Sequence, residues 1–403
     1  MNNITINDKF QPLFDSDARY FILTGGRGSG KSYSATISET TNTFKNGYNC
    51  LYTRYTMTAA ELSIIPEFRE KISLLKCDRY FDVQKKEIVN TITDARVLFR
   101  GIKTSSGNQT ANLKSLQGIS TWVLDEAEEM ISEDDFNTID LSIRSNVQQN
   151  RIVLIMNPTT KEHWVYKRFF EEMGVQEGFN GRVENVQYIH STYLDNKDNL
   201  PQDYLNEIDR IKRTNLSKYK HKILGQWLDR ADGVVFDNWE YGEFNPNGLQ
   251  TSFGLDFGYS IDPDALVEVA IDKSKRIIYL KEHIYQKGLG SSQLSAIIKA
   301  RSGNKLIIAD SAEPRLIADL KAKGINIKPV KKGKIEEGVT LMQDFKLIVE
   351  PNSNNIGREL NNYVYLDKGS KLYIDDFNHA IDASRYNVTF HLDNPNSGKY
   401  HVL

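Results

Sequence analysis

Short apolar runs alternate with helix-like amphipathic stretches from residue 20 to about residue 230. Runs of this kind are typical of strands buried on both faces of a sheet. The alternation therefore predicts an α/β domain with a mostly parallel sheet. The expected strands are residues 20–23, 49–54, 121–124 and 151–156, with a hairpin at 87–92 and 96–100. Helices are expected at residues 33–44 and across 203–228, the latter rich in Lys and Arg.

A second pattern begins near residue 251. It predicts a strand at 253–258, a hairpin of 265–271 and 276–280, strands at 305–309 and 325–330 with helices between, and a closing helix at 376–386. Three antiparallel strands followed by alternating helices and strands is the element order of a ribonuclease H-like fold. Residues 232–250 have little periodicity and contain glycines and a proline. We therefore expect domains at 1–231 and 251–403, joined by a linker at 232–250.

The bulk composition narrows the class of protein. The chain has 403 residues, of which 39% are hydrophobic and 26% charged, as in ordinary globular proteins. Its formal net charge of −2 means that any surface for nucleic acid must be a local patch. Cys50 and Cys77 cannot form a disulfide framework, which suits a reducing compartment. We expect neither a membrane span nor a secretory signal.

A glycine-rich loop follows the first predicted strand. Gly25, Gly30, Lys31 and Ser32 fit the pattern G-x-x-x-x-G-K-[ST], and Gly28 lies between them. The glycines let backbone N–H groups surround a polyphosphate, Lys31 can reach the β- and γ-phosphates, and the Ser32 hydroxyl can ligate Mg²⁺. With a strand before it and a helix after it, the loop predicts an ATP site.

Two carboxylates end the strand at residues 121–124. In an ATPase with a phosphate loop, Asp125 would hold Mg²⁺ and Glu126 would polarise the attacking water. Arg27 lies inside the loop, where its guanidinium could neutralise the γ-phosphate during transfer, although it could also be a surface arginine paired with a carboxylate. Asn157 follows the next strand and could sense the γ-phosphate, although Asn157-Pro158 is equally typical of a turn.

Acidic residues in the second block lie where a metal site could form. Asp256 and Asp310 end two predicted strands, and His379 and Asp382 share one face of the last helix because they are three residues apart. Three convergent carboxylates can hold two Mg²⁺ or Mn²⁺ ions that clamp the water and the leaving oxygen of a phosphodiester. Solvated acidic side chains are the alternative. Glu282, Asp375 and Asp376 are weaker candidates for this site.

Two basic clusters could contact phosphates or could simply be solvated. The first contains Arg210, Lys212, Arg213, Lys218, Lys220 and Lys222. The second contains Lys328, Lys331, Lys332 and Lys334, and its place in the predicted nuclease block makes it the better candidate for DNA.

With these motifs in place, the chain resembles the large terminase subunits of tailed bacteriophages over nearly its whole length. The resemblance rests on residues 25–32, 113–118, 122–126, 190–196, 254–259, 309–314 and 378–386. Some members have a clear adenine-binding glutamine ahead of the loop, where this chain has only Gln11.

The resemblance implies a DNA-packaging motor with an N-terminal ATPase and a C-terminal ribonuclease H-like nuclease that cuts concatemeric DNA. Carried over by position, Lys31 and Ser32 bind ATP and Mg²⁺, Asp125 supports the metal, Glu126 activates water and Asn157 couples the sites. Asp256, Asp310 and Asp382 become the ligands of two Mg²⁺ or Mn²⁺ ions, with His379 beside them. The implied partners are double-stranded viral DNA, a small terminase subunit and the portal protein of the prohead. The family also implies a monomer in solution, a ring on the portal, and the cytoplasm of a bacterium that carries the phage or prophage.

Two other interpretations fit the motifs. A helicase or repair ATPase with an accessory nuclease would share the phosphate loop and the acidic pair, but it should also show a second motor domain, and the sequence shows none. An assembly ATPase whose second block has lost nuclease activity would differ in a plasmid-cleavage assay with Mn²⁺.

Overall fold

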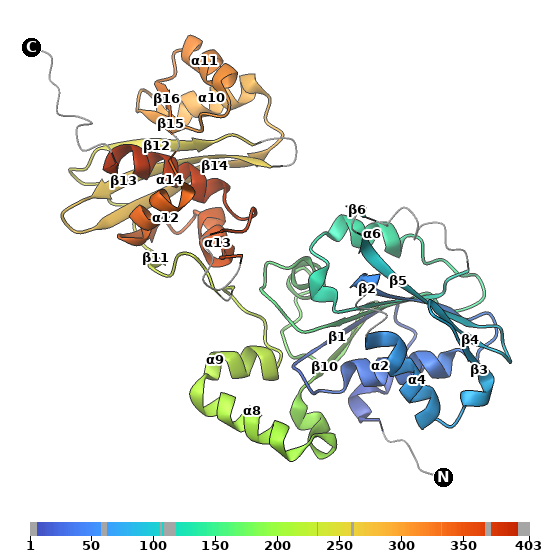
Figure 1. Ribbon diagram of the computed structural model, residues 1–403. Helices are drawn as coiled ribbons and strands as arrows, with labels where there is room; N and C mark the ends of the chain where they lie inside the picture. Colours follow the sequence, from blue (N-terminus) through green and yellow to red (C-terminus); the bar gives the residue numbers. More distant parts are fainter. Residues whose placement is uncertain are drawn as a thin grey trace, which may run out of the picture. The chain divides into compact units, whose positions relative to one another are not determined.

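A computed structural model describes residues 6–57, 63–104, 107–108, 118–231, 233–258, 262–331, 333–366 and 372–393. The chain divides into two units, Met1–Asp229 and Arg230–Leu403, each with its own sheet (Figure 1). Residues 113–117 and Tyr259, which carry part of the family resemblance, lie outside the described residues, as does Lys332 of the second basic cluster.

The first unit is built on a sheet whose described strands run in the order β3-β4-β5-β2-β7-β8-β1-β10-β9, with β6 beside β5. The strands are β1 Tyr20–Gly25, β2 Asn49–Thr56, β3 Phe81–Val83, β4 Glu87–Asn90, β5 Arg96–Thr104, β6 Gly107–Asn108, β7 Thr121–Asp125, β8 Arg151–Met156, β9 Gly181–Val183 and β10 Val186–Ser191. The run from β5 to β10 is parallel, and the predicted hairpin of β4 and β5 is confirmed. The parallel order brings the ends of β1, β2, β7 and β8 to one edge of the sheet.

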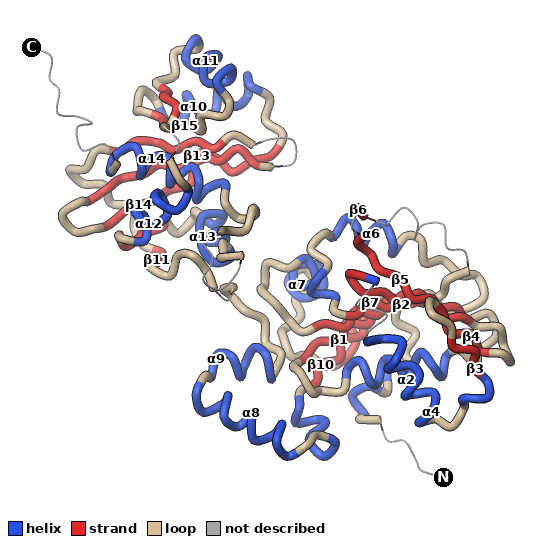
Figure 2. The backbone as a smooth tube through the Cα atoms, in the orientation of Figure 1, coloured by secondary structure: helices blue, strands red, loops and turns tan. Residues whose placement is uncertain are grey.

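Helices cover both faces of this sheet (Figure 2). They are α1 Pro12–Asp15, α2 Lys31–Asn42, α4 Ile65–Leu74, α6 Glu133–Asp140, α7 Trp164–Tyr166, α8 Gln202–Thr214 and α9 Leu216–Lys218. One core lies under α2 and α4 and contains Ala35 and Phe68, and the other lies under α6 and α7 and contains Phe136 and Trp164. No helix among the described residues is both long enough and apolar enough to cross a membrane.

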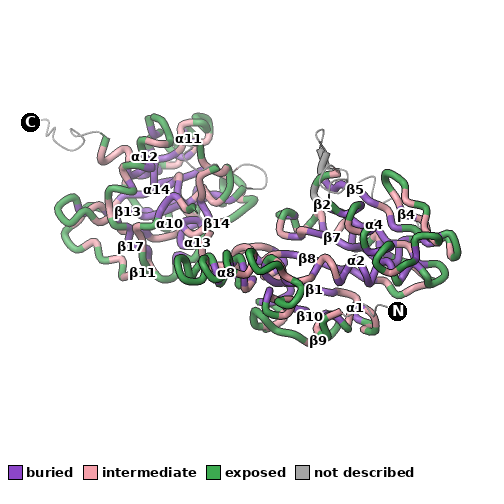
Figure 3. Tube along the Cα trace, turned by 60° about the horizontal axis from the view of Figure 1, so that its bottom comes forward, coloured by how far each residue is buried: buried purple, intermediate pink, exposed green. Residues whose placement is uncertain are grey.

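The helical stretch expected at 203–228 is shorter and is divided. After α8 and α9 the chain makes a π-helical turn, Tyr219–Ile223, and then leaves the helix at Gly225, whose φ is +70°. A left-handed residue ends a helix, and glycine adopts that conformation without strain. Figure 3 shows that α8 is largely exposed, in contrast with the buried strands β1 and β8.

The second unit has a sheet in the order β11-β17-β14-β13-β12-β15-β16 within the described residues. The strands are β11 Trp239–Tyr241, β12 Thr251–Asp256, β13 Pro263–Asp272, β14 Ile277–Lys287, β15 Ile307–Ala309, β16 Ile327–Pro329 and β17 Lys346–Val349. As predicted, β12, β13 and β14 are antiparallel neighbours, and β15 joins β12 in parallel. This is the order expected of a ribonuclease H-like fold.

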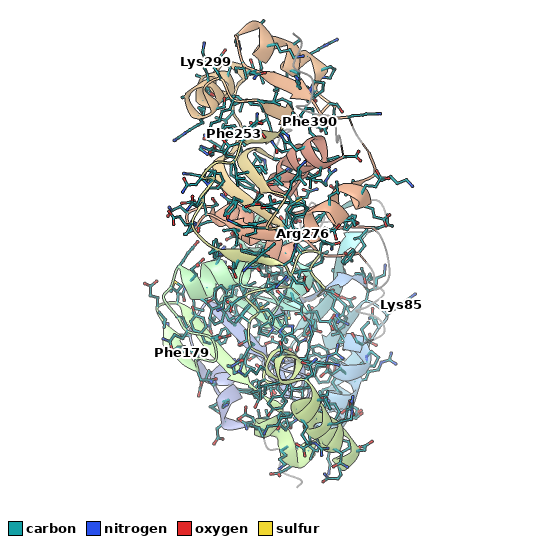
Figure 4. The ribbon with its side chains drawn as sticks, turned by 90° about the vertical axis from the view of Figure 1, so that its left-hand side faces the viewer. Lys85, Phe179, Phe253, Arg276, Lys299 and Phe390 are labelled. Atoms are coloured by element: carbon teal, nitrogen blue, oxygen red, sulfur yellow. The ribbon has the colours of Figure 1, made fainter. Side chains whose placement is uncertain are left out.

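Five helices described in the second unit form two layers. They are α10 Ser291–Ser302, α11 Pro314–Ala322, α12 Ile335–Gln343, α13 Asn354–Asn362 and α14 His379–Leu392. The core beneath α10 and α11 contains Phe253 of β12, which is labelled among the side chains in Figure 4. The opposite core contains Val339, Leu360 and Ala383 of α12, α13 and α14. The closing helix therefore begins at His379, three residues later than expected.

The segment expected as a linker, 232–250, contributes to the second unit instead. Val235 and Phe236 are buried in its core, and β11 pairs in parallel with β17. The short apolar groups in this segment lack a clear period because each one makes a different contact. Burial of Phe236 against the sheet is favourable enough to order the chain locally.

Candidate functional site

The glycine-rich loop and the ends of β2, β7 and β8 enclose a cavity of about 350 Å³. It is lined by residues 26–33 with Arg54, Ser63, Glu67, Asp125, Glu126, Ile155, Met156 and Asn157. Gly28 and Gly30 have φ of +76° and +83°, which place the loop directly before the first turn of α2. The free N–H groups and the dipole at this helix start attract an anion. The structure thus brings the predicted nucleotide-site residues together.

Lys31 lies at the floor of the cavity. Its Nζ donates hydrogen bonds to the carbonyl oxygens of Gly25 and Gly26, at 2.9 and 3.0 Å, and to Oδ1 of Asn157 at 3.3 Å. Burial lowers the pKa of Lys31 to about 8, although Glu128 and Asp125 favour the charged form. The ammonium group is held within the loop that would receive phosphate.

Asp125 and Glu126 have different surroundings. Asp125 is buried, which raises its pKa to about 6, while Arg54, Lys31 and the hydroxyl of Ser32 oppose that rise. A carboxylate beside a Ser hydroxyl offers the hard oxygen ligands that Mg²⁺ requires, so Asp125 and Ser32 fit a metal. Glu126 is more exposed, has a φ of +54° and forms an ion pair with Arg54.

Asn157 connects the cavity to a second buried carboxylate. While its Oδ1 accepts from Lys31, its backbone N and Nδ2 donate to Glu128 at 3.2 and 3.0 Å. Arg27 is exposed at the cavity and makes no ion pair with a carboxylate of the described residues. Its backbone N–H donates to the carbonyl oxygen of Lys222. The alternative of an Arg27–carboxylate pair is therefore not what the structure shows.

Several residues of this site escaped the sequence analysis. Arg54 ends β2, Glu67 lies on α4, and Glu128 follows the acidic pair. Burial raises the pKa of Glu67 to about 7. Gln11 is exposed, bonds Asp15 and does not line the cavity. None of these roles has a local sequence signal, because each depends on which strands are neighbours.

The candidate nuclease residues gather at one edge of the second sheet. Asp256 ends β12 and Asp310 follows β15, and the two strands pair in parallel with Leu255 opposite Ala309. Helix α14 crosses this edge closely, because a Cβ on Gly254 would lie 1.8 Å from the carbonyl oxygen of Ala383. Only glycine allows that approach. It brings Asp382 of α14 to the two strand ends.

Positive groups already neutralise two of these carboxylates. His379 Nδ1 lies 3.1 Å from Oδ2 of Asp256, and Arg385 donates to Oδ1 of Asp382 from Nε and Nη2 at 3.1 and 2.9 Å. Burial, with the charges of Asp382 and Asp310, raises the pKa of Asp256 to about 6, against the bond from His379. Burial also raises the pKa of Asp382, against Arg385.

The mutual effect of these charges means that the three Asp residues are near neighbours, and oxygen donors of this kind fit Mg²⁺ or Mn²⁺. No group of three His, Cys, Asp or Glu residues within the described ranges stands ready to ligate a metal. The pairs with His379 and Arg385 keep Asp256 and Asp382 engaged. Metal binding would thus require these pairs to rearrange.

The weaker candidates lie elsewhere. Glu282 bonds the start of α13 through both oxygens. Asp375 and Asp376 are exposed and bond Asn378 and Phe377. In the basic clusters, Lys328, Lys331 and Lys334 are exposed, as are the six residues of the first cluster.

Comparison with known proteins points to one family. Residues 17–226 match the family described as phage terminase large subunit, and residues 256–389 match the terminase RNase H-like domain. The chain is 28% identical to the large terminase subunit of Bacillus phage SPP1, over 96% of each protein. It is 23% identical to the PBSX phage terminase large subunit of Bacillus subtilis (strain 168), over 94% of this chain and 93% of that protein. A solved structure of the large terminase from a thermophilic bacteriophage covers 96% of this chain and all of that one, with 18% identity and a TM-score of 0.46.

Proposed function

The chain belongs to the phage terminase large subunits, and on that premise we propose that it hydrolyses ATP to drive double-stranded DNA into a prohead and cleaves concatemeric DNA. The observation that carries the proposal is the pairing of two sites in one chain. One unit holds a phosphate loop facing Asp125 and Glu126, and the other holds three neighbouring Asp residues on a ribonuclease H-like sheet.

For ATP hydrolysis, the loop N–H groups and Lys31 bind the β- and γ-phosphates. Asp125 and Ser32 would hold Mg²⁺, which supplies charge to the phosphates when bound. Glu126 orients water and accepts its proton as the water oxygen bonds the γ-phosphorus and the bond to the β–γ bridging oxygen breaks. Arg27 neutralises the charge on the transferred group. Asn157, bonded to both Lys31 and Glu128, links phosphate release to the end of β8.

For DNA cleavage, Asp256, Asp310 and Asp382 would hold two Mg²⁺ or Mn²⁺ ions. Such ions activate water and stabilise the leaving oxygen of a phosphodiester. His379 lies against Asp256 and can orient that carboxylate. Lys331 and Lys334 are exposed in the same unit and would contact DNA phosphates.

Family membership supports further proposals about assembly. We propose that the chain is monomeric in solution, forms a ring on the portal protein of the prohead, receives DNA from a small terminase subunit, and acts in the cytoplasm of the host bacterium. A helicase is disfavoured because both halves of the chain match terminase families.

Two variants of the full chain test the proposal. Lys31→Ala should abolish ATP hydrolysis and leave plasmid cleavage with Mn²⁺ intact, whereas Asp256→Ala should do the reverse. The two effects separate because the residues lie in different units. A folded wild-type chain that hydrolyses ATP and binds Mn²⁺ but never cuts DNA would instead indicate an assembly ATPase without nuclease activity.

A further inference from the structure

Glu359 is a fully buried carboxylate on α13 that lies against the beginning of another helix. One of its oxygens accepts a hydrogen bond from the backbone N–H of Ile381 at 2.9 Å, and the N–H of Ala380 also bonds the carboxylate. The other oxygen accepts from the hydroxyl of Tyr285 at 2.9 Å. These N–H groups belong to the first turn of α14, which starts at His379.

The first turn of α14 lacks a cap of its own. Asn378 stands at the N-cap position, and its side chain makes no capping hydrogen bond. The first N–H groups of a helix have no partner within the helix, and a nearby negative charge also favours the positive end of the helix dipole. Glu359 therefore does from α13 what a local Ser or Asp does in most helices.

This turn carries two of the residues assigned to DNA cleavage. His379 is its first residue and bonds Asp256, and Asp382 lies one turn later. A helix end that frays or rotates would move both side chains relative to Asp256 and Asp310. The position of the carboxylate group thus depends on whether the start of α14 is held.

Helix α13 is itself held by a buried bond to a carboxylate. Oε2 of Glu282, on β14, accepts from the backbone N–H groups of Asn355 and Ile356 at 3.0 and 3.2 Å, and its Oε1 accepts from Asn355 Nδ2 at 2.7 Å. Ser353 precedes α13 and makes no capping bond. Strand β14 thus fixes α13 through Glu282, and α13 fixes α14 through Glu359.

We propose that Glu359 is a positioning residue of the nuclease, which holds the start of α14 so that His379 and Asp382 face Asp256 and Asp310. Glu282 supports it one step further from the site. The proposal rests on the nuclease function proposed above. It assigns a role to Glu282 other than metal ligation, because both of its oxygens are engaged by α13.

The test uses the full chain with Glu359→Ala and Glu359→Gln. The Gln variant keeps the shape and one acceptor oxygen but loses the charge, so it should behave between the Ala variant and the wild type. Tyr285→Phe removes the other partner of Glu359 and leaves the bond to Ile381, and Glu243→Gln removes an exposed carboxylate from the same unit. ATP hydrolysis checks that the first unit is folded in every variant.

Hydrogen exchange in the metal-free chain is the first measurement. In Glu359→Ala the amides of Ala380 and Ile381 should exchange about 5- to 30-fold faster, as expected for the loss of a helix cap. Amides of β12 should keep their protection. Calorimetry should show Mn²⁺ affinity lowered by about 10- to 100-fold, and plasmid cleavage should fall similarly with an unchanged KM for DNA. Tyr285→Phe and Glu243→Gln should change cleavage little.

The outcomes separate the two proposals. If the wild type binds Mn²⁺ and cuts DNA, and Glu359→Ala does both equally well, the positioning role is overturned while the nuclease stands. If Glu359→Ala exchanges faster throughout the second unit, Glu359 serves overall stability and the role is again overturned. A wild type that neither binds Mn²⁺ nor cuts DNA would overturn the nuclease and the positioning role together.

Discussion

The guanidinium of Arg54 forms an ion pair with the carboxylate of Glu126. Arg54 is buried at the end of β2, where its Nη1 donates to Oγ of Ser63 at 2.8 Å and its Nε lies 3.8 Å from Asp125. The contact exists because β2 and β7 are parallel neighbours, so their ends meet. Glu126 has a left-handed backbone, a conformation that costs free energy and is often found at functional sites. Arg54 is thus the charge that balances the two adjacent carboxylates.

Replacing Arg54 tests whether this balance matters for hydrolysis. Arg54→Ala should lower kcat for ATP by about 10-fold or more, because Glu126 loses the group that fixes its carboxylate. Arg54→Lys keeps the charge without the planar fork and should recover part of the rate. Steady-state hydrolysis by the three proteins measures this. A kcat equal to that of the wild type in Arg54→Ala would show that Glu126 orients itself.

Arg27 differs from Arg54 because no described carboxylate engages it. If its guanidinium acts on the γ-phosphate in the transition state, Arg27→Lys should lower kcat and leave ATP affinity nearly unchanged. Affinity measured with a non-hydrolysable nucleotide, together with kcat, separates the two effects. A loss confined to affinity would mean that Arg27 only binds the ground state.

Gly225 touches the phosphate loop from the far end of the first unit. A Cβ at this position would lie 2.3 Å from the carbonyl carbon of Gly25 and 2.6 Å from the N of Gly26. Gly225→Ala should therefore destabilise the first unit and weaken ATP binding. Gly174→Ala is a matched control, because Gly174 has a similar φ, +63°, and a Cβ added there would meet nothing within 4 Å.

The two alanine variants separate backbone strain from crowding. Gly174→Ala should cost about 1–2 kcal/mol from the left-handed backbone alone and leave ATP binding unchanged. Gly225→Ala should cost about 1–3 kcal/mol more, because the loop must shift. Urea unfolding and ATP titration of both variants measure the difference. Equal effects in the two variants would mean that the contact with Gly25 yields easily.

The parts of the fold that local sequence determines could be predicted. The strand, loop and helix around Lys31 form one continuous segment, and Asp125 follows an apolar run, so pattern alone placed both. The hairpin of β13 and β14 has the same local origin. The contacts that complete each site are different. Arg54 meets Glu126 only through the pairing of β2 with β7, and no spacing along the chain encodes that pairing.

The second unit shows the same limit. Asp256, Asp310 and Asp382 were predicted because each ends a strand or lies on a helix of clear period. Glu359 looks like any acidic residue of an amphipathic helix, and its capping role depends on the packing of α13 against α14. The error at 232–250 has a related cause. Phe236 and Trp239 make separate contacts with the core and with β17, so they leave no period to detect.

Glu268 of β13 sits between two basic side chains on the second sheet. Its Oε2 lies 2.9 Å from His283 Nε2 and its Oε1 lies 2.7 Å from Lys305 Nζ. The ring of His283 also packs against Phe253, which is labelled in Figure 4. Burial alone would raise the pKa of Glu268, but hydrogen bonds from His283, Lys305 and Thr251 outweigh it and lower the pKa to about 2.

The lowered pKa gives a stability effect with a defined pH range. The pKa of an unperturbed Glu is about 4.5, so the folded state favours the carboxylate more than the unfolded state does. This contribution to the free energy of unfolding should be fully present above pH 4.5 and should disappear as the pH falls towards about 2. Glu268→Gln should accordingly cost about 1–2 kcal/mol at pH 7 and much less near pH 2.

The measurement is urea unfolding of the full chain from pH 7 to pH 2, followed by hydrogen exchange of the β13 amides so that only the second unit is observed. Glu243→Gln is the control, because Glu243 is exposed in the same unit. Its effect should be small at every pH, since an exposed carboxylate contributes little to stability. If the difference between wild type and Glu268→Gln stays constant from pH 7 to pH 2, the stabilisation comes from packing around Phe253 rather than from the charge of Glu268.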